Sequence, residues 1–224
     1  MARVVVIGSS GRLGSFACTL LEADSGFELV GRFGSQDDLV ANLESCDAEV
    51  GLDCTVAKLG AKHGELMLRA GVRPVIGTSG VTREELGGLD NLAQELGLGG
   101  IVVPNFSLGV VLQQRMAELA AQHLQSVEII ETHHEKKADA PSGTALDTAQ
   151  RLEAITRANV PIHSLRLPGV HSNQEVVFGG SGEILRLVHE TYSLEAFAPG
   201  ILASLRYAQQ AAGVALGLGA ALEK

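Results

Sequence analysis

Apolar and polar residues follow two recurring patterns in the first half of the chain. Short runs of β-branched and apolar residues predict buried strands, and longer segments with an apolar stripe predict helices. The expected strands are Arg3–Ile7, Phe27–Arg32, about 48–53, Arg73–Gly77 and Gly100–Val103. The first expected helix follows the first strand and ends near Glu22, and further helices are expected over about 57–70, Arg83–Leu96 and Leu108–Gln122. In the last of these, the apolar residues Leu112, Met116 and Leu119 lie on one stripe of the kind that usually faces a core. This alternation predicts a parallel sheet with right-handed crossovers, and therefore a Rossmann-like doubly wound α/β domain.

The pattern changes near residue 124. A strand is expected over Val127–Thr132 and a helix over Ser142–Ala154, followed by three strands without helices between them: Ile162–Leu167, Glu175–Phe178 and Glu183–His189. A last helix over Pro199–Gln210 precedes a Gly/Ala-rich tail. We therefore expect a domain over 1–107, completed by about 199–224, and a second, α+β domain over 108–198 with a mixed or antiparallel sheet.

Composition limits the classes of protein to consider. The 224 residues are 46% apolar and 19% charged, with a net charge of −9 and no basic arm, which argues against a nucleic-acid partner. The three cysteines, Cys18, Cys46 and Cys54, lack metal-ligand spacing and indicate buried apolar residues in a reducing compartment. No apolar run reaches the length of about 18 residues that a membrane span needs. We expect a cytoplasmic protein without a membrane partner.

A glycine-rich turn follows the first expected strand and opens the first expected helix. Its spacing is GxxGxxG, and its residues are Gly8, Ser9, Ser10, Gly11, Arg12, Leu13 and Gly14. Such glycines permit a tight turn and a close approach of the backbone to a diphosphate, and the helix N-terminus adds amide donors. The alternative is a packing turn, whereas a Walker loop is disfavoured because no Lys-Ser/Thr pair follows. The turn therefore predicts a dinucleotide phosphate site.

The end of the second expected strand bears on the choice of dinucleotide. An acidic residue there usually binds the adenosine ribose of NAD, but in this chain the first acid is Asp37. Arg32 and Ser35 suit a 2′-phosphate instead, which favours NADPH. The alternative is a solvated arginine at a strand end.

Turn-forming polar residues also follow the next three expected strands, at Asp53–Thr55, Gly77–Gly80 and Pro104–Ser107. In open α/β sheets, ligands bind beyond the carboxyl ends of the strands, so these loops predict a dinucleotide cleft. Each loop alone is also explained as a helix start, with Thr55 or Ser107 as an N-cap.

A basic cluster stands out in this acidic chain. His133, His134, Lys136 and Lys137 lie within five residues, after an expected strand. Either histidine can hold or relay a proton near neutral pH. A zinc site is disfavoured because adjacent histidines rarely share a metal and no third ligand is evident, so no metal is expected.

The same segment leads into a helix with Ser142 as the expected N-cap. The amides of Gly143 and Thr144 then lie at a positive helix end, which favours a carboxylate, and the nearby cations complement a second one. A solvated charged loop before a capped helix is the alternative. The pattern favours a site for a small dicarboxylate.

The segment Glu131–Ala145 resembles the 4-hydroxy-tetrahydrodipicolinate reductase (dihydrodipicolinate reductase) family of lysine and diaminopimelate biosynthesis. It matches the family pattern E-x-H-H-x-x-K-x-D-A-P-S-G-T-A at every fixed position. The glycine-rich turn, the strand ends and the later segments Gln174–Gly179 and Phe197–Gly200 follow in the family's order. The resemblance therefore covers essentially the whole chain.

The resemblance implies a role for each part of the site. His133 would be the catalytic acid/base and Lys137 the proton donor, while the substrate carboxylates would bind His134, Ser142, Gly143 and Thr144, with Lys136 nearby. NADPH or NADH would bind the first domain through Gly8, Ser9, Ser10, Gly11, Arg12, Leu13, Gly77, Thr78, Ser79, Val103, Pro104, Asn105 and Phe106. To these the strand ends themselves add Arg32, Ser35, Asp53 and Thr55 as candidate cofactor-binding residues. The second domain would bind substrate and form a homotetramer through its sheet.

Some features depart from the family pattern. The acid that binds the ribose is missing, and the stretch before Ile162 is short where family members usually carry a longer loop. The usual Gly-Thr-Thr-Gly and Asp-Phe-Thr read Gly-Thr-Ser-Gly and Asp-Cys-Thr. Two alternatives stay open: an aspartate-dehydrogenase-like enzyme with the same dinucleotide half, and a catalytically silent protein that senses NADPH.

Overall fold

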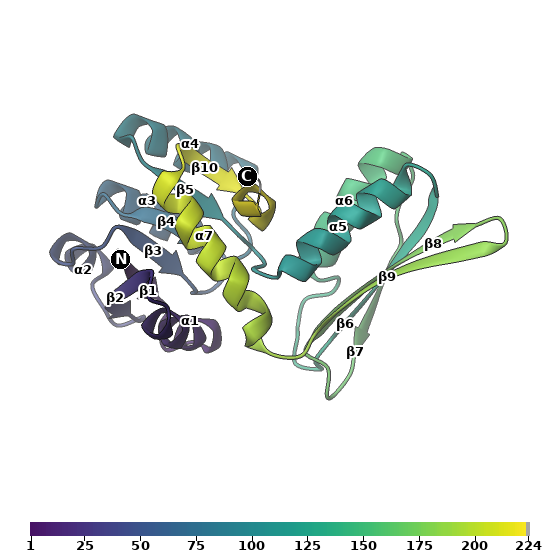
Figure 1. The fold of residues 1–224 in the computed structure, drawn as a ribbon, viewed down its shortest axis with the longest axis horizontal. Coiled ribbons are helices and arrows are strands. Elements are labelled where there is room, and N and C mark those ends of the chain that lie inside the picture. The colour runs from purple at the N-terminus through teal and green to yellow at the C-terminus, as the bar shows by residue number, and fades with distance from the viewer. Residues whose placement is uncertain (223–224) are drawn as a thin grey trace. The chain divides into compact units, whose positions relative to one another are not determined.

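The chain forms two compact units in a computed structural model that describes residues 1–222 (Figure 1). The first unit comprises Met1–Phe106 together with the chain from Phe197 onwards. The second unit is Ser107–Ala196. The chain thus leaves the first unit at residue 107 and returns to complete it at residue 197.

The first unit is built on a six-stranded parallel sheet with the order β10-β5-β4-β3-β1-β2. Its strands are β1 (Ala2–Ile7), β2 (Phe27–Phe33), β3 (Val50–Asp53), β4 (Arg73–Ile76), β5 (Gly99–Val102) and β10 (Gly213–Leu216). Its helices are α1 (Arg12–Ala23), α2 (Leu39–Ser45), α3 (Gly60–Arg69), α4 (Arg83–Leu96) and α7 (Ala198–Gln210), with a short 3₁₀ turn, η2 (Leu218–Leu222), after β10. The predicted doubly wound fold is confirmed.

Helices cover both faces of this sheet (Figure 1). On one face, Leu43 of α2, Met67 of α3 and Leu89 of α4 form a core with Val5 and Val102 of the strands. On the other face, α7 packs on β3, β4 and β5, and α1 packs on β1 and β2. Because both faces are covered, the central strands are mostly apolar, which explains the unbroken run Val4–Ile7 in β1.

The structure differs from the sequence prediction at several elements of this unit. Helix α2 and strand β10 were not predicted. Helix α3 begins at Gly60 rather than near 57, and strand β3 begins at Val50 rather than near 48. A turn at residues 57–58 separates Thr55 from α3, whose N-cap is Leu59, so Thr55 does not cap that helix.

The second unit is a four-stranded mixed sheet with the order β7-β6-β8-β9. Strand β6 (Ser126–His133) is parallel to β7 (Ile162–Arg166) and antiparallel to β8 (Ser172–Gly180), which is antiparallel to β9 (Glu183–Thr191). Helices α5 (Leu108–Ala121) and α6 (Gly143–Thr156) pack on one face around Ile129, Leu152 and Phe178, and the 3₁₀ turn η1 (Leu194–Phe197) follows β9. The predicted α+β architecture is confirmed.

The interpretation of the α5 stripe as core-facing is wrong. Leu112, Met116 and Leu119 are each at least half exposed. The buried face of α5 instead carries the small residues Ala117 and Ala121, which let the helix lie close to α6 and the sheet, together with hydrogen-bonded glutamines.

Those glutamines form a buried polar network. Gln113 Nε2 donates to the carbonyls of Gln174 (2.7 Å) and Leu187 (2.8 Å), and Gln174 Nε2 donates to Thr148 Oγ1 (3.0 Å). The Thr148 hydroxyl donates to the carbonyl of Thr144 in the first turn of α6 (2.8 Å). Apolar periodicity does not reveal this face because its hydrogen-bonding residues are polar.

Within residues 1–222, no helix is long and apolar enough to cross a membrane. The three cysteines are free thiols; Cys18 is buried, and Cys46 and Cys54 are partly exposed. Burial raises the pKa of the Cys54 thiol to about 12. That thiol is therefore protonated and unreactive at neutral pH.

Candidate active site

The glycine-rich turn lies between β1 and α1. Gly8 has φ +80°, and the amides of Gly8 and Ser9 donate to the Phe33 carbonyl at 2.8 and 3.1 Å. At Gly14, a Cβ would lie 2.1 Å from the Gly8 carbonyl oxygen, so only glycine allows the helix to start this close to the turn. Gly11 is the N-cap of α1 and provides no side-chain acceptor for the amides of the first turn. This geometry suits a diphosphate at the helix N-terminus.

The loops after β3, β4 and β5 meet at one edge of the same sheet. Asp53 is fully buried, and its Oδ1 accepts from the Thr55 amide at 2.9 Å, while the Gly77 amide donates to the Asp53 carbonyl at 2.8 Å. A Cβ at Gly77 would lie 2.7 Å from the ring of Phe106, which is also buried. The expected convergence of these loops is therefore present in the structure.

Two buried oxygens at this edge, Asp53 Oδ2 and Thr78 Oγ1, have no hydrogen-bond partner within the described chain. The His63 ring, which the sequence interpretation did not include, has its Nδ1 3.5 Å from Asp53 Oδ2 and 3.4 Å from Thr55 Oγ1. Asp53 Oδ2 therefore faces the His63 ring, and Thr78 Oγ1 is the buried oxygen at this edge that is left without a partner among the described residues. Leaving such a group unpaired is costly, so this edge suits a polar ligand such as a dinucleotide. Ser79 and Pro104 are exposed at the same loops, Val103 is buried and Asn105 is partly buried.

The end of β2 carries the residues expected to discriminate between the dinucleotides. Arg32 is exposed and forms an ion pair with Glu22 of α1. Ser35 is exposed in the following loop, and Asp37 Oδ2 accepts from the Gly34 amide at 2.6 Å. Asp37 thus stabilises the backbone of this turn. Ser10 and Arg12 are exposed and Leu13 is partly buried on the glycine-rich turn.

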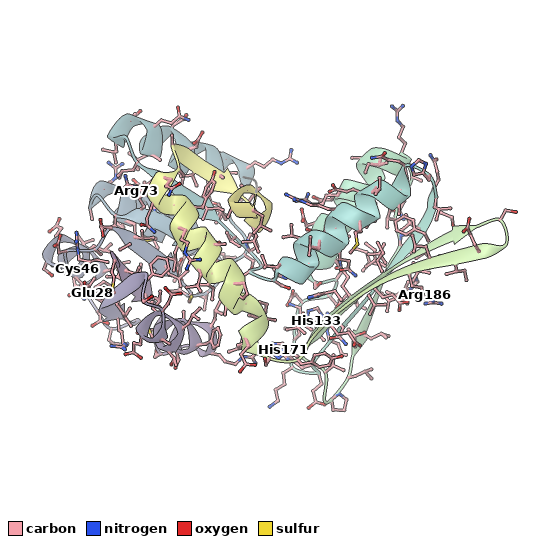
Figure 2. The ribbon with its side chains drawn as sticks, in the orientation of Figure 1. Glu28, Cys46, Arg73, His133, His171 and Arg186 are labelled. Carbon is pink, nitrogen blue, oxygen red and sulfur yellow. The ribbon has the colours of Figure 1, made fainter. Side chains whose placement is uncertain are left out.

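In the second unit, His133 is the last residue of β6 (Figure 2). Its Nδ1 donates to Glu131 Oε2 at 2.5 Å, and Glu131 is fully buried. Arg166 of β7 donates to both oxygens of Glu131 at 2.9 Å. Burial acts to raise the pKa of Glu131, but the hydrogen bonds from Arg166, Ser164 and His133 outweigh it, so Glu131 is ionised at neutral pH.

His133 itself is neutral at neutral pH. Burial lowers its pKa, and the positive charges of Lys137 and Arg166 lower it further, against the opposing effect of Glu131. Because Nδ1 donates to a carboxylate, Nε2 is the ring nitrogen without a proton.

The basic loop follows directly after β6. Lys137 Nζ donates to both oxygens of Asp139 at 2.8 Å, and the Lys137 amide donates to the His134 carbonyl at 3.1 Å. His134 and Lys137 are partly buried, whereas Lys136 is exposed. The Lys137–Asp139 pair holds the amine in place at the loop.

Helix α6 begins at the end of this loop. Ser142 is its N-cap, as predicted, with Oγ accepting from the Ala145 amide at 3.2 Å. The Ser142 amide donates to Glu131 Oε1 at 3.2 Å, which ties the helix start to the partner of His133. A Cβ at Gly143 would meet no atom within 4 Å, so the first turn of α6 is open to a ligand. A positive helix end that follows a basic loop suits a carboxylate.

The structure thus collects the residues predicted for the cofactor in the first unit and those predicted for the substrate and for proton transfer in the second. Three contributors were missed: His63, Arg166, and Glu131 as the partner of His133. A carboxylate two residues before the motif histidine was a signal for Glu131; nothing local indicates Arg166. Among the described residues, no group of three or more His, Cys, Asp or Glu side chains could hold a metal ion.

Comparisons with known proteins agree with this arrangement. Residues 2–106 match the family model described as "Dihydrodipicolinate reductase, N-terminus", and residues 109–222 match "Dihydrodipicolinate reductase, C-terminus". The chain is 39% identical over 219 residues to a 4-hydroxy-tetrahydrodipicolinate reductase of Coxiella burnetii, covering 91% of this chain and 92% of the relative. It is 38% identical over 220 residues to the enzyme of the same name from Legionella pneumophila, covering 89% and 90%.

A solved structure extends the likeness to three dimensions. The dipicolinate-bound dihydrodipicolinate reductase from Paenisporosarcina sp. TG-14 superposes with a TM-score of 0.86 at 32% identity, covering 97% of this chain and 98% of that chain. The match includes both units, the one with the glycine-rich turn and the one with the His133 loop. The chain belongs to the dihydrodipicolinate reductase family.

Proposed function

We propose that this protein reduces 4-hydroxy-tetrahydrodipicolinate (dihydrodipicolinate) to tetrahydrodipicolinate in the cytoplasm, in lysine and diaminopimelate biosynthesis. The observation that carries the proposal is the basic loop. It places a neutral His133, an ion-paired Lys137 and the open N-terminus of α6 within one short segment. That combination of a proton acceptor, a cation and an anion-binding helix end suits a ring that carries two carboxylates.

In this proposal, the substrate carboxylates bind the first turn of α6 and the imidazole of His134. Gly143 and Thr144, held by the Ser142 cap, present the positive helix end to one carboxylate, and His134 contacts the substrate from the loop. Holding the ring rigidly lowers the entropic cost of reaching the reactive geometry.

We assign proton transfer to His133 and Lys137. His133 Nε2, the ring nitrogen without a proton, acts as the acid/base position, and Lys137 donates the proton that completes the reduction. Asp139 orients the Lys137 amine until the substrate replaces it.

A nicotinamide cofactor, NADPH or NADH, supplies the hydride when bound. The residues of the first unit fit it: the turn from Gly8 to Leu13 would hold the diphosphate, and the oxygens of Asp53 and Thr78 would receive polar groups near Phe106. We propose a preference for NADPH, in which Arg32 leaves its ion pair with Glu22 and binds the 2′-phosphate together with Ser35.

We also propose a homotetramer assembled through the face of the second sheet that no helix covers. Leu165, Ile184 and Val188 are 44%, 65% and 60% exposed on this sheet. Side chains at 165, 184 and 188 alternate with those that face α5 and α6, so an apolar surface is left for another copy of the chain.

The decisive experiment follows oxidation of NADPH spectroscopically with the freshly made condensation product of pyruvate and aspartate semialdehyde. Wild-type protein turns over, and Lys137→Ala loses most turnover while retaining NADPH binding in calorimetry. Lys136→Ala is the matched control, because this exposed neighbour lies outside the proposed site, and it keeps nearly full activity.

Two results would overturn the proposal. Binding of NADPH without any turnover would indicate a dinucleotide-sensing protein, and turnover with aspartate instead would indicate an aspartate-dehydrogenase-like enzyme. Equal affinities for NADH and NADPH, measured with and without pyridine-2,6-dicarboxylate, would refute the proposed preference alone.

A further inference from the structure

The Arg166 side chain contacts two different parts of the candidate active site. Its guanidinium forms a two-pronged ion pair with Glu131, both N–O distances being 2.9 Å. The same group donates to the backbone carbonyls of Lys137 (3.3 Å, from Nε) and Asp139 (2.6 Å, from Nη2). One side chain thus holds both the partner of His133 and the backbone that carries Lys137.

Strand register explains how this contact arises. Strands β6 and β7 are parallel, and their pairing sets His133 opposite Arg166 and Glu131 opposite Ser164. Side chains at 131, 133 and 166 therefore project from the same face, at the carboxyl ends of two neighbouring strands. Such strand ends are rigid positions from which to orient loop residues.

We propose that Arg166 and Glu131 are positioning residues that prepare both proton-handling side chains, Glu131 by fixing the proton of His133 on Nδ1 and Arg166 by anchoring Glu131 together with the Lys137 backbone. The inference rests on the proposed function, because it assigns the two residues to that reaction. Neither residue is required to touch the substrate.

The electrostatic surroundings support this assignment. Without Arg166, the fully buried Glu131 side chain would favour its neutral form. A neutral carboxyl group carries a proton of its own that it can donate, so it no longer orients His133 in the same way. The charged groups around His133 are Glu131 on its own strand, Arg166 on β7 and Lys137 in the loop, whereas β8 presents the uncharged Ser172 opposite it. The arrangement keeps His133 neutral and directional.

The first test compares Arg166→Met, Arg166→Lys and Glu131→Gln with the control Arg69→Met. Arg69 lies on α3 of the first unit and forms an ion pair with Glu65 at 2.8 Å, but its side chain is 61% exposed. We expect kcat to fall roughly 10²–10⁴-fold in Arg166→Met and Glu131→Gln, as when a catalytic histidine loses its orienting carboxylate. The dissociation constant for NADPH changes less than about twofold, and Arg69→Met behaves as wild type.

Arg166→Lys separates charge from geometry. Lysine keeps the positive charge but lacks the planar fork that reaches two carboxylate oxygens and two carbonyls. Its kcat is therefore expected to lie between those of wild type and Arg166→Met. Circular dichroism and thermal unfolding establish that each variant is folded. If Arg166→Met does not fold, the two single variants Arg166→Lys and Glu131→Gln carry the test.

A second readout needs no activity. In ¹⁵N-labelled, ligand-free protein, the His133 ring is expected to carry its proton on Nδ1 at neutral pH. In Arg166→Met, a positive charge beside the Glu131–His133 pair is gone, so the pair takes up its proton at higher pH than in wild type. The pH profile of kcat/KM shifts in the same direction.

The possible failures are distinguishable. Wild-type protein that never turns over refutes the proposed function, while the ¹⁵N measurement still tests the inference. A ring protonated on Nε2 in the wild type refutes the inference. So does an Arg166→Met variant that keeps the wild-type kcat and the wild-type titration of His133.

Discussion

Replacing Gly14 by alanine tests the phosphate loop directly. Gly14 is in the first turn of α1, and a Cβ there would lie 2.1 Å from the Gly8 carbonyl oxygen and 3.0 Å from Ser9 Cα. Ordinary contact begins near 3.4 Å, so the turn and the helix must separate by about 1 Å. Both contacting groups are backbone atoms, which cannot rotate away.

The magnitude follows from two opposing effects. Overpacking of this kind costs about 1–3 kcal/mol, and alanine returns about 0.5–1 kcal/mol through its better helix propensity. The net loss is about 1 kcal/mol, or roughly 2–4 °C in Tm for a chain of this length. Cofactor binding suffers more, because losing one charge-assisted bond from the loop to a phosphate costs about 1.5–3 kcal/mol, which weakens Kd roughly 10- to 100-fold.

Calorimetry with NADPH and thermal unfolding measure the two effects separately. Gly88→Ala is the matched control, since Gly88 lies within α4 and a Cβ there would meet no atom within 4 Å. That variant gains about 0.5–1 kcal/mol in stability and binds NADPH as wild type does. A Gly14→Ala protein with wild-type affinity would show that this loop does not bind the diphosphate.

Three other features give predictions of stability. Gln113→Leu removes the donor to two buried strand carbonyls and destabilises the second unit by about 2–4 kcal/mol in urea unfolding, whereas Gln122→Leu at the exposed end of the same helix changes stability by less than about 0.5 kcal/mol. Burial lowers the pKa of His189, so as the pH falls the unfolded chain, in which this histidine has a pKa of about 6.5, takes up the proton first. Stability is therefore full above that pH and declines as the pH falls towards the folded-state pKa, and His189→Gln flattens the decline; identical slopes in the two proteins would contradict the assignment. Thr82→Ala removes the capping box of α4 and lowers stability by about 1 kcal/mol, and an unchanged Tm would contradict that role.

The elements that were predicted correctly have strong local signals. Strand β1 contains the unbroken apolar run Val4–Ile7, and α4 is preceded by the N-cap Thr82 with Glu85 three residues later. The loop of the candidate active site was also predictable, because His133 to Thr144 are contiguous in the sequence. Residues close together in the sequence determine these features, so they can be predicted from a single sequence.

The elements that were missed have weak local signals. Helix α2 buries only Leu43 within its seven residues, and β10 is four residues within a Gly/Ala-rich stretch. The contact of Arg166 with Glu131 depends on the register of β6 against β7, and the two residues are 35 positions apart. The apolar stripe through Met116 was misassigned because burial on α5 follows small side chains and buried glutamines rather than large apolar ones.

The interrupted connectivity of the first unit has a consequence for synthesis on the ribosome. Residues 1–106 emerge first but lack α7 and β10 until the chain from 197 onwards has been made, while 107–196 can already fold as a contiguous block. During that interval, the edge of β5 that later pairs with β10 has no partner strand, and the surface of β3–β5 beneath α7 is bare. Translation that stops before Ala198 therefore leaves a product with an open sheet edge, which is a template for aggregation. The last strand to be synthesised closes the sheet that the first strand begins.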